Sequence, residues 1–409
     1  MSSIYHRISN RIHKVASKYP RLMYLVALPF VIIDLIGYII YPLDFLLARK
    51  EACGEIFYLG GMGIYDTRMD TLLDSISRAS TVGIQRLRRI GALPFADSYD
   101  FPFAESPTGN NISDHIPFRQ LMLCVRDRYT KQVIDSMISD FIKGSMNKDR
   151  LFIGNDANSK RFIYDIIFGI DTSDIDLAPF DKPRKYMINV FLANLVPQRF
   201  LKTPELERSV TKLSQLLMDK LNINEKQSRL LITGIEITWN GITRTLYKTF
   251  EYLQKNPEYA NRFIETGDVE ILRRCIIEST RFLNGHPGIS LVETLESERV
   301  LTPEYTAPAG STLILSIAVS QWDTKHIASP EIFNPERSEI DLIRKTMFYG
   351  MLNDNLNNRS CPFQYTAMSI LTQVVAHILN NYTWEKSEMT FAKIPTLESE
   401  LVLNGLYPV

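Results

Sequence analysis

The stretch "NNRSCPFQYTAMSILTQVVAHIL" (residues 357–379) carries one cysteine, Cys361, at the point where a polar loop gives way to a long apolar helix. A cysteine taken alone is most often a small buried hydrophobe. At the N-terminus of a helix, however, the amide groups stabilise negative charge and favour the thiolate over the thiol. No histidine lies close to Cys361 in the sequence to act as its base. Cys361 is therefore a candidate nucleophile or metal ligand.

The overall composition argues against several other kinds of site. The remaining cysteines, Cys53, Cys124 and Cys275, lie far apart and form no CxxC pair. A disulfide framework or a cysteine-rich zinc site is therefore disfavoured, and a reducing compartment is expected. The chain has 46 basic and 46 acidic residues. Because this balance leaves no net field to attract a polyanion, nucleic-acid binding is disfavoured as well.

The N-terminus differs from the rest of the chain. Residues 1–21 carry five basic side chains and no acidic one, and residues 22–48 are almost wholly apolar. An apolar stretch of this length reaches the roughly 20 residues that a membrane-crossing helix needs. We therefore expect residues 1–48 to be a membrane-associating segment ahead of a catalytic domain at 49–409. The domain at 49–409 is expected to face the cytosol.

Three residues within the apolar stretch argue against a simple membrane-spanning helix. Asp34 lies near its middle, and Pro29 and Pro42 interrupt it. A pair of helices lying in the plane of the membrane interface accommodates these residues better. Two other interpretations remain open, namely a buried helical hairpin and a transit sequence.

Helix dominates the periodicity of the remaining chain. Residues 116 to about 285 show mainly helical spacing of apolar residues, and the longest such run is 224–255. Short strands are predicted at 54–66 around a Gly-Gly turn, at 306–323 and in the tail 396–409. The sequence thus predicts a mainly α fold with small β-sheets near both ends, of the α+β class.

An ordered series of motifs accompanies the cysteine. "IIESTRFL" (276–283) places Glu278 and Arg281 three residues apart on one helix face, where they can pair. It lies between the long helix with "TGIEIT" (233–238) and "SPEIFNPERS" (329–338), and "NRSC" then opens the last helix. From about residue 52 to 409 this order resembles the cytochrome P450 family of haem-thiolate proteins. The resemblance implies that Glu278 and Arg281 are structural and tie their helix to the segment before the cysteine loop.

The same resemblance implies a set of cofactor ligands. Cys361 corresponds to the proximal ligand of the iron in haem b, iron protoporphyrin IX. "SDHIPFRQLMLCV" (113–125) is similar to the family's helix that meets the haem propionates, with His115 and Arg119 in the matching places. Arg359, two residues before the cysteine, matches another propionate contact. Two carboxylates in a dry pocket need cationic or hydrogen-bonding partners.

Two regions depart from the family pattern. In the cysteine loop, Asp354, Asn357 and Phe363 stand where the family usually has a phenylalanine and two glycines. In the long helix the family pattern is glycine, any residue, an acid and then threonine, but here Glu236 is followed by an isoleucine and Thr238 comes one place late. One position corresponds to about 100° of helix rotation, so Thr238 is expected to point away unless the helix is bulged.

These features predict a haem-thiolate oxidoreductase of the monooxygenase type that acts on an apolar small molecule. Glu236 is the first candidate for proton handling and Thr238 the second. A separate reductase is expected because no flavin, nicotinamide or iron–sulfur motif occurs in the chain. Two alternatives remain: an isomerase, dehydratase or peroxygenase that uses a hydroperoxide and needs no proton relay, and a haem-free interaction module.

Overall fold

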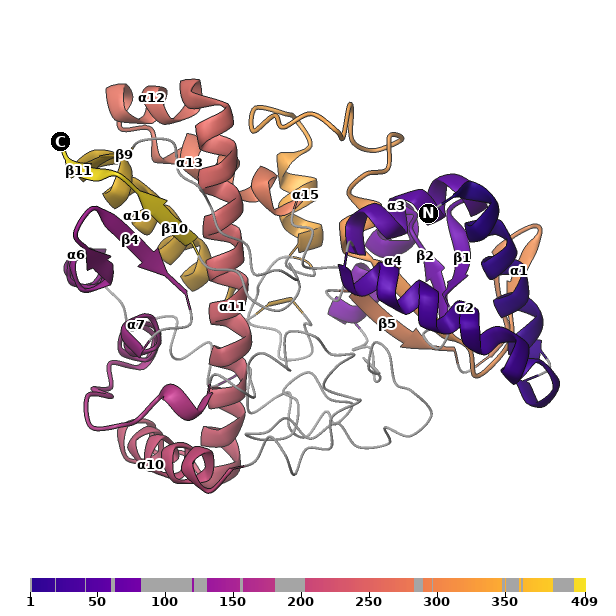
Figure 1. Ribbon diagram of the computed structural model, residues 1–409, viewed down its shortest axis with the longest axis horizontal. Coiled ribbons are helices and arrows are strands. Elements are labelled where there is room, and N and C mark those ends of the chain that lie inside the picture. The colour runs from indigo at the N-terminus through magenta and orange to yellow at the C-terminus, as the bar shows by residue number, and fades with distance from the viewer. Residues whose placement is uncertain are drawn as a thin grey trace.

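The fold is mainly helical with small sheets, as the sequence predicts (Figure 1). The computed structural model describes residues 2–18, 20–40, 42–59, 63–81, 120, 131–154, 157–180, 203–282, 290–295, 297–347, 350, 360–361, 363–384 and 401–409. Its helices are α1 (Ser3–Lys18), α2 (Pro20–Ile40), α3 (Pro42–Cys53), α4 (Met69–Thr81), α6 (Lys131–Ser145), α7 (Ala157–Phe168), α10 (Pro204–Leu221), α11 (Glu225–Lys255), α12 (Pro257–Thr266), α13 (Val269–Thr280), α14 (Ile317–Ser320), α15 (Ile340–Met347) and α16 (Gln364–Asn381), with a 3-10 turn η1 (Ala178–Phe180).

The described strands form four small sheets. They are β1 (Ile56–Leu59), β2 (Gly63–Asp66), β3 (Met146–Asn147), β4 (Arg150–Ile153), β5 (Ser290–Thr294), β6 (Arg299–Thr302), β7 (Tyr305–Ala307), β8 (Thr312–Ser316), β9 (Tyr382–Trp384), β10 (Leu401–Asn404) and β11 (Leu406–Pro408). The largest sheet has the order β1-β2-β8-β5, with β2 and β8 parallel and the other neighbours antiparallel. It joins the two strands predicted at 54–66 to β8, from the stretch predicted as strand at 306–323; β7 pairs with β6 in a separate sheet, and residues 317–320 of that stretch form the helix α14 instead.

One glycine is required where these strands meet. Gly63 has φ of +146°, and a Cβ atom there would lie 2.5 Å from the carbonyl oxygen of Thr312 in β8. Only glycine allows β2 to approach β8 this closely. Gly63, the last glycine of the predicted turn, therefore sets how closely β2 and β8 pack.

The long helix α11 runs through the body of the molecule (Figure 1). Asn224 begins it with a capping box, in which its side chain and that of Gln227 each accept a hydrogen bond from the other residue's backbone amide. A buried stripe then follows at helical spacing, and its members are Leu231, Ile235, Trp239, Ile242, Leu246 and Phe250. The helix predicted at 224–255 is confirmed. Helices α7, α10, α13 and α16 pack around it.

A small sheet interrupts the helical region and was missed by the sequence analysis. β3 and β4 form a hairpin, and β4 pairs with β10 from the C-terminal tail, with Ile153 opposite Leu401. Strands of two and four residues are too short to show a two-residue period. Their partner lies some 250 residues further along the chain, so no local signal announces the pairing.

The N-terminal helices α1, α2 and α3 meet around a buried carboxylate. Asp34 of α2 and Arg49 of α3 are both fully buried and pair at 2.6 Å. On α1, the hydroxyl of Ser9 donates to Asp34 at 2.7 Å, that of Tyr5 donates at 2.9 Å, and His13 Nε2 lies 2.9 Å away. One carboxylate thus joins three helices.

The electrostatics of this cluster follow from burial and from the arginine. Burial and the charge of Arg49 lower the pKa of His6 to about 4, so the imidazole is neutral near pH 7. For Asp34, burial alone would raise the pKa, but hydrogen bonds from His13 and Ser9 and the charge of Arg49 outweigh it and lower the pKa. Asp34 therefore carries its charge inside the protein.

This cluster also attaches the N-terminal helices to the main sheet. The side-chain oxygen of Asn10 accepts a hydrogen bond from the amide of Tyr58, and Arg49 donates to the carbonyl of the same residue. Tyr58 lies on β1, the edge strand of the sheet. Helix α1 thereby covers backbone groups that an edge strand would otherwise expose. Among the described residues, no helix is both long enough and apolar enough to cross a bilayer.

Replacing Asp34 with alanine is expected to destabilise this N-terminal unit by about 3–5 kcal/mol, because it leaves the guanidinium of Arg49 buried without its counter-ion. Amide hydrogen exchange in α1–α3 measures the free energy of local opening. Asp44→Ala, which removes an exposed carboxylate on α3, is the control and is expected to change exchange by less than about 0.5 kcal/mol. Equal protection in both variants would show that the cluster does not hold the helices.

Candidate functional site

Cys361 lies three residues before the first residue of α16. Its side chain is half-buried and packs against the main hydrophobic core. Its carbonyl accepts hydrogen bonds from the backbone and the side-chain nitrogen of Gln364, both at 3.3 Å. Phe363, at the N-cap position, has no side-chain group that can cap the first turn. The amide end of α16 therefore stabilises a negative charge beside the cysteine.

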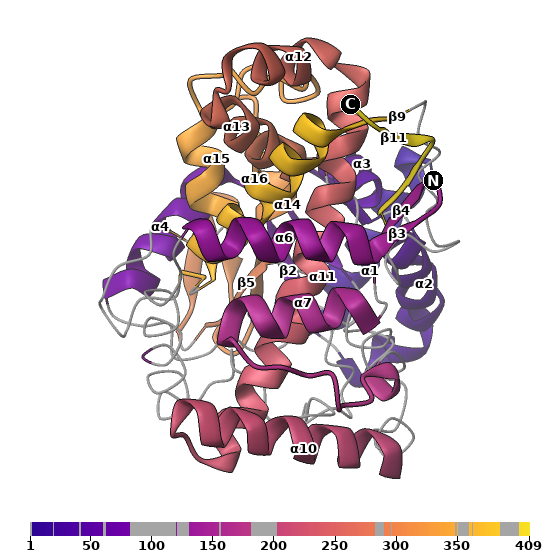
Figure 2. The ribbon, with the colours of Figure 1, turned by 90° about the vertical axis from the view of Figure 1, so that its left-hand side faces the viewer.

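Helix α16, which begins three residues after Cys361, has much of its own surface buried. Packed against it are α13, α11 and α6, as Figure 2 shows for α13 and α6. Its buried apolar residues recur at three- and four-residue spacing and are Ile370, Leu371, Val374, Val375, Ile378 and Leu379. A residue just ahead of such a helix lies next to a well-packed element, which restricts its position.

Glu278 of α13 and Arg281, the C-cap residue of that helix, form a buried ion pair, as predicted. Arg281 donates from Nη2 and Nε to the two carboxylate oxygens at 2.8 and 3.0 Å. Arg281 also donates to the carbonyls of Gln321 and Ile332, which lie in the segment leading toward the cysteine loop. The predicted structural role of the pair is therefore confirmed.

A third member of this ion cluster, Arg337, was missed. Its Nε donates to Glu278 at 3.0 Å, and its other nitrogens donate to the carbonyls of Ala328 and Ile332. The backbone amide of Asn334 donates to the same carboxylate. Arg337 is the one basic residue of "SPEIFNPERS", but the neighbouring sequence does not indicate that its side chain is buried against Glu278.

The helix α11 supplies the residues considered for proton transfer. All of its residues from 225 to 255 are α-helical, so it contains no bulge that would rotate Thr238. Thr238 is half-buried, next to the fully buried Trp239, whose indole nitrogen donates to the carbonyl of Gly154 at 2.8 Å. The backbone of Glu236 belongs to α11, but its side chain lies outside the described part of the structure.

The other predicted cofactor residues cannot be placed. His115, Arg119 and Arg359 lie outside the described residues, as do Asp354 and Asn357 of the cysteine loop. Within the described residues, no group of three or more His, Cys, Asp and Glu side chains could together hold a metal ion. Of the predicted ligands, the structure therefore places Cys361 alone.

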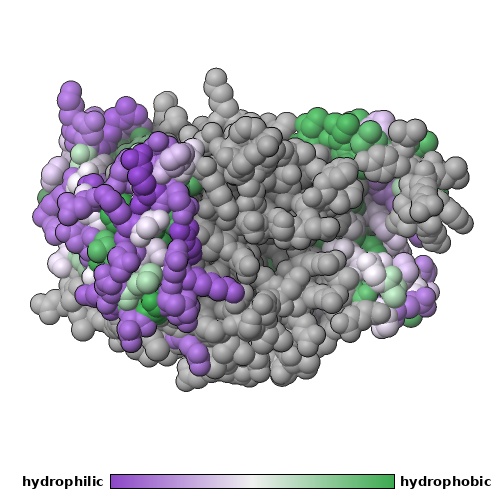
Figure 3. Space-filling view, turned by 90° about the horizontal axis from the view of Figure 1, so that it is seen from below, coloured by the Kyte–Doolittle hydropathy of each residue, from purple (hydrophilic) through white to green (hydrophobic). Residues whose placement is uncertain are grey.

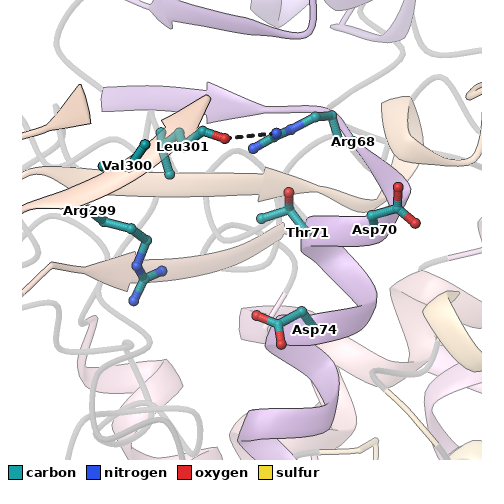
Figure 4. Close-up of a pocket in the computed structure, with 7 residues that line it drawn as sticks. All are labelled: Arg68, Asp70, Thr71, Asp74, Arg299, Val300 and Leu301. Atoms are coloured by element: carbon teal, nitrogen blue, oxygen red, sulfur yellow. Dashed lines mark hydrogen bonds between the residues drawn. The ribbon is translucent and has the colours of Figure 1, made fainter. Parts of the chain in front are cut away.

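A surface hollow of about 450 Å³ lies elsewhere, between the start of α4 and the strand β6 (Figure 4). It is lined by Arg68, Asp70, Thr71, Asp74, Arg299, Val300 and Leu301. Arg68 is already paired with Asp66 at 2.6 Å and donates to the carbonyl of Leu301, and Asp70 is paired with Lys325. Neither α11 nor α16 contributes to its lining, so the hollow is separate from the Cys361 site.

No family profile matches the chain. Short stretches are similar to curated proteins. Over 122 residues the chain is 25% identical to cytochrome P450 4g15 of Drosophila melanogaster, covering 29% of this chain and 21% of that protein. Over 195 residues it is 24% identical to thromboxane-A synthase of Macaca fascicularis, covering 43% of this chain and 36% of that protein. The matches thus span well under half the length of these relatives.

Solved structures are similar over nearly the whole chain. An OleT cytochrome P450 in complex with arachidonic acid superposes with a TM-score of 0.65 at 12% identity, covering 92% of this chain and 96% of that one. P450BioI in complex with a fatty-acid-ligated acyl carrier protein gives 0.62 at 14% identity, covering 89% and 97%. The P450 haem domain of Tepidiphilus thermophilus gives 0.56 at 12% identity, covering 90% and 94%. The chain has the cytochrome P450 fold, and its relatives in sequence and in structure are cytochrome P450s.

Proposed function

We propose that this protein is a haem-thiolate oxidoreductase of the monooxygenase type, with Cys361 as the protein ligand of the iron. The observation that carries the proposal is the position of this cysteine on a cytochrome P450 fold. It is a half-buried thiol before a rigid, largely buried helix whose first turn has no side-chain cap. This environment favours a thiolate, which is the donor that a haem iron of this class requires.

The proposed cofactor is haem b, which when bound supplies the redox chemistry that activates oxygen. His115, Arg119 and Arg359 are proposed to hold its propionates through charge-assisted hydrogen bonds. Apolar side chains of the main core pack against the half-buried Cys361 and would shield the bound cofactor from water on that side. In this arrangement the chain orients the cofactor and shields it.

The proposed substrate is an apolar small molecule, and a long acyl chain is the first class to test. Two of the structural neighbours were solved with such molecules, arachidonic acid and an acyl carrier protein bearing hexadec-9Z-enoic acid. Electrons are proposed to come from a separate reductase, since the sequence carries no motif for a second redox cofactor. Residues 22–48 are proposed to bring the protein to a membrane, with the haem domain on the cytosolic side.

A hydroperoxide-using isomerase, dehydratase or peroxygenase is the second candidate, and the register of α11 favours it. Thr238 lies about 100° of rotation from the position at which the family places its alcohol, and the helix is regular there. A reaction that begins from a hydroperoxide needs no proton relay to cleave dioxygen. Turnover with reductase and dioxygen, compared with turnover of a fatty-acid hydroperoxide without reductase, separates the two. Product from neither, together with no bound haem, would leave the haem-free interaction module.

If Glu236 handles protons, Glu236→Gln is expected to lower turnover with reductase and dioxygen about a hundredfold, because an amide cannot donate the proton. Turnover driven by hydrogen peroxide should change much less, since that oxidant arrives already reduced. Glu225→Gln is the matched control, because Glu225 is exposed in the first turn of the same helix. An equal loss with both oxidants would contradict a proton-relay role and assign Glu236 to structure.

A further inference from the structure

Helix α1 has its polar and apolar sides reversed relative to a helix of a water-soluble protein. Its buried side chains include His6, Ser9 and His13, which face Asp34. Its exposed side chains include Ile4 and Ile8, which are 69% and 46% exposed, and Val15. A surface helix in water normally buries its apolar stripe and exposes its polar side.

Helix α2 shows the same reversal. Between Arg21 and Ile40 the sequence has one charged residue, Asp34, and its side chain is fully buried. Among the side chains of α2 that the structure describes, the large exposed ones are apolar and are Val26, Leu28, Ile32, Ile33 and Ile36. Together with Ile4, Ile8 and Val15 they form what we call the outer face. Half of the large hydrophobic side chains that are exposed in the described structure belong to this face, and the others are spread from Leu216 to Val409.

The charged side chains that α1 carries beside the outer face have one sign. Arg7, Arg11 and Lys14 are exposed on α1, and residues 1–21 contain no acidic residue. On a helical wheel Arg11, Arg7 and Lys14 follow one another along one side of the stripe of Ile4, Ile8 and Val15. Figure 3 shows apolar atoms gathered at the upper right, over the end of the molecule that α1 and α2 form. The surface is therefore apolar with a cationic border.

We propose that the outer face docks on an anionic lipid bilayer and that α1 and α2 lie along the interface instead of crossing it. The proposal deepens the membrane association proposed above and is independent of the haem. Apolar side chains would enter the acyl boundary while the arginines and lysine meet anionic headgroups. A second copy of this chain is a poorer occupant, because pairing two identical faces would oppose like charges.

The buried ion pair explains why α2 stays in the interface. A lone carboxylate in hydrocarbon is costly, but Asp34 is compensated by Arg49 on α3, which leads directly into the sheet. Moving α2 across the bilayer would separate this pair and remove α1 from the edge strand β1. Docking through the outer face leaves both intact.

The test uses full-length protein floated with vesicles of phosphatidylcholine alone or with phosphatidylserine. The wild type is expected to float with the anionic vesicles, and less so with the neutral ones or in high salt. Ile32→Ser/Ile36→Ser and, on the other helix, Ile4→Ser/Ile8→Ser should each lower partitioning at least about tenfold. The control is Ile264→Ser/Val300→Ser, two exposed hydrophobic residues outside the outer face, and it should float like the wild type.

Three outcomes would overturn the proposal. The first is a wild type that floats with neither kind of vesicle, and the second is outer-face variants that float as well as the control. Alternatively, sedimentation could show that the outer face holds a dimer, which the variants convert to monomer without any vesicle binding. Melting curves test whether each variant is folded. Because the two variant pairs lie on different helices, one pair still tests the proposal if the other does not fold.

Orientation is tested with a protease-cleavable tag before residue 1 in sealed microsomes. Cleavage of the tag from the same side as the body is expected, and protection of the tag would show a crossing helix instead. The carbon monoxide difference spectrum of the same samples separates this proposal from the proposed function. Vesicle binding without a haem spectrum would contradict the proposed haem-thiolate function alone. A haem spectrum without vesicle binding would contradict the membrane docking alone.

Discussion

Cys361→Ser is expected to abolish the red-shifted Soret band that a thiolate-ligated ferrous haem gives with carbon monoxide, and to reduce turnover to background. A serine hydroxyl is a much weaker donor to iron than a thiolate, so the variant would lose the axial ligand while keeping the shape of the loop. The difference spectrum of the reduced, carbon monoxide-treated protein measures this directly. The haem content, measured by extraction, distinguishes loss of the thiolate ligand from loss of the whole cofactor.

The matched control for this variant is Cys53→Ser. Cys53 is also half-buried, and its Sγ donates a hydrogen bond to the carbonyl of His6, far from α16 in the chain. Burial raises the pKa of the Cys53 thiol, in contrast to the thiolate required of an iron ligand. The control should keep the wild-type spectrum. An unchanged spectrum in Cys361→Ser, or its loss in Cys53→Ser, would show that Cys361 does not bind the iron.

The parts of this fold that could be predicted are those whose signals are local. The helix α11 is predicted by a capping residue, Asn224, by apolar residues at helical spacing and by Pro257 just beyond its end. The pairing of Glu278 with Arg281 follows from three-residue spacing on one helix. Cys361 before α16 follows from the change of composition at residue 361. Each of these needs only a short window of sequence.

The remaining features depend on contacts between distant segments. Arg337 reaches Glu278 from 59 residues away, and β4 pairs with β10 across most of the chain. Hydropathy alone marked residues 22–48 as a membrane segment. It could not reveal that Asp34 meets Arg49 inside the protein, because that contact requires three helices to cross at one point. The reversed pattern of α1 is visible on a helical wheel, but the wheel does not say which side faces inward.

Glu278→Gln is expected to destabilise the whole domain, and not one unit of it, by about 3–5 kcal/mol. Glu278, Arg281 and Arg337 are all at most 5% exposed, so neutralising the carboxylate leaves two cations buried without compensation. Urea unfolding, followed by circular dichroism, measures the change. Glutamine nearly preserves the shape of the side chain, so a loss of this size would reflect charge and not packing.

Glu336→Gln is the control for Glu278→Gln, because Glu336 is exposed, pairs with Arg262 and directly precedes Arg337 in the sequence. Exposed pairs contribute about 0–1 kcal/mol, so this control should unfold near the wild-type urea concentration. A double variant, Glu278→Gln/Arg337→Gln, removes one of the stranded cations and should recover part of the loss. If Glu278→Gln were as stable as the control, the ion cluster would not be what anchors α13 to the segment between Gln321 and Arg337.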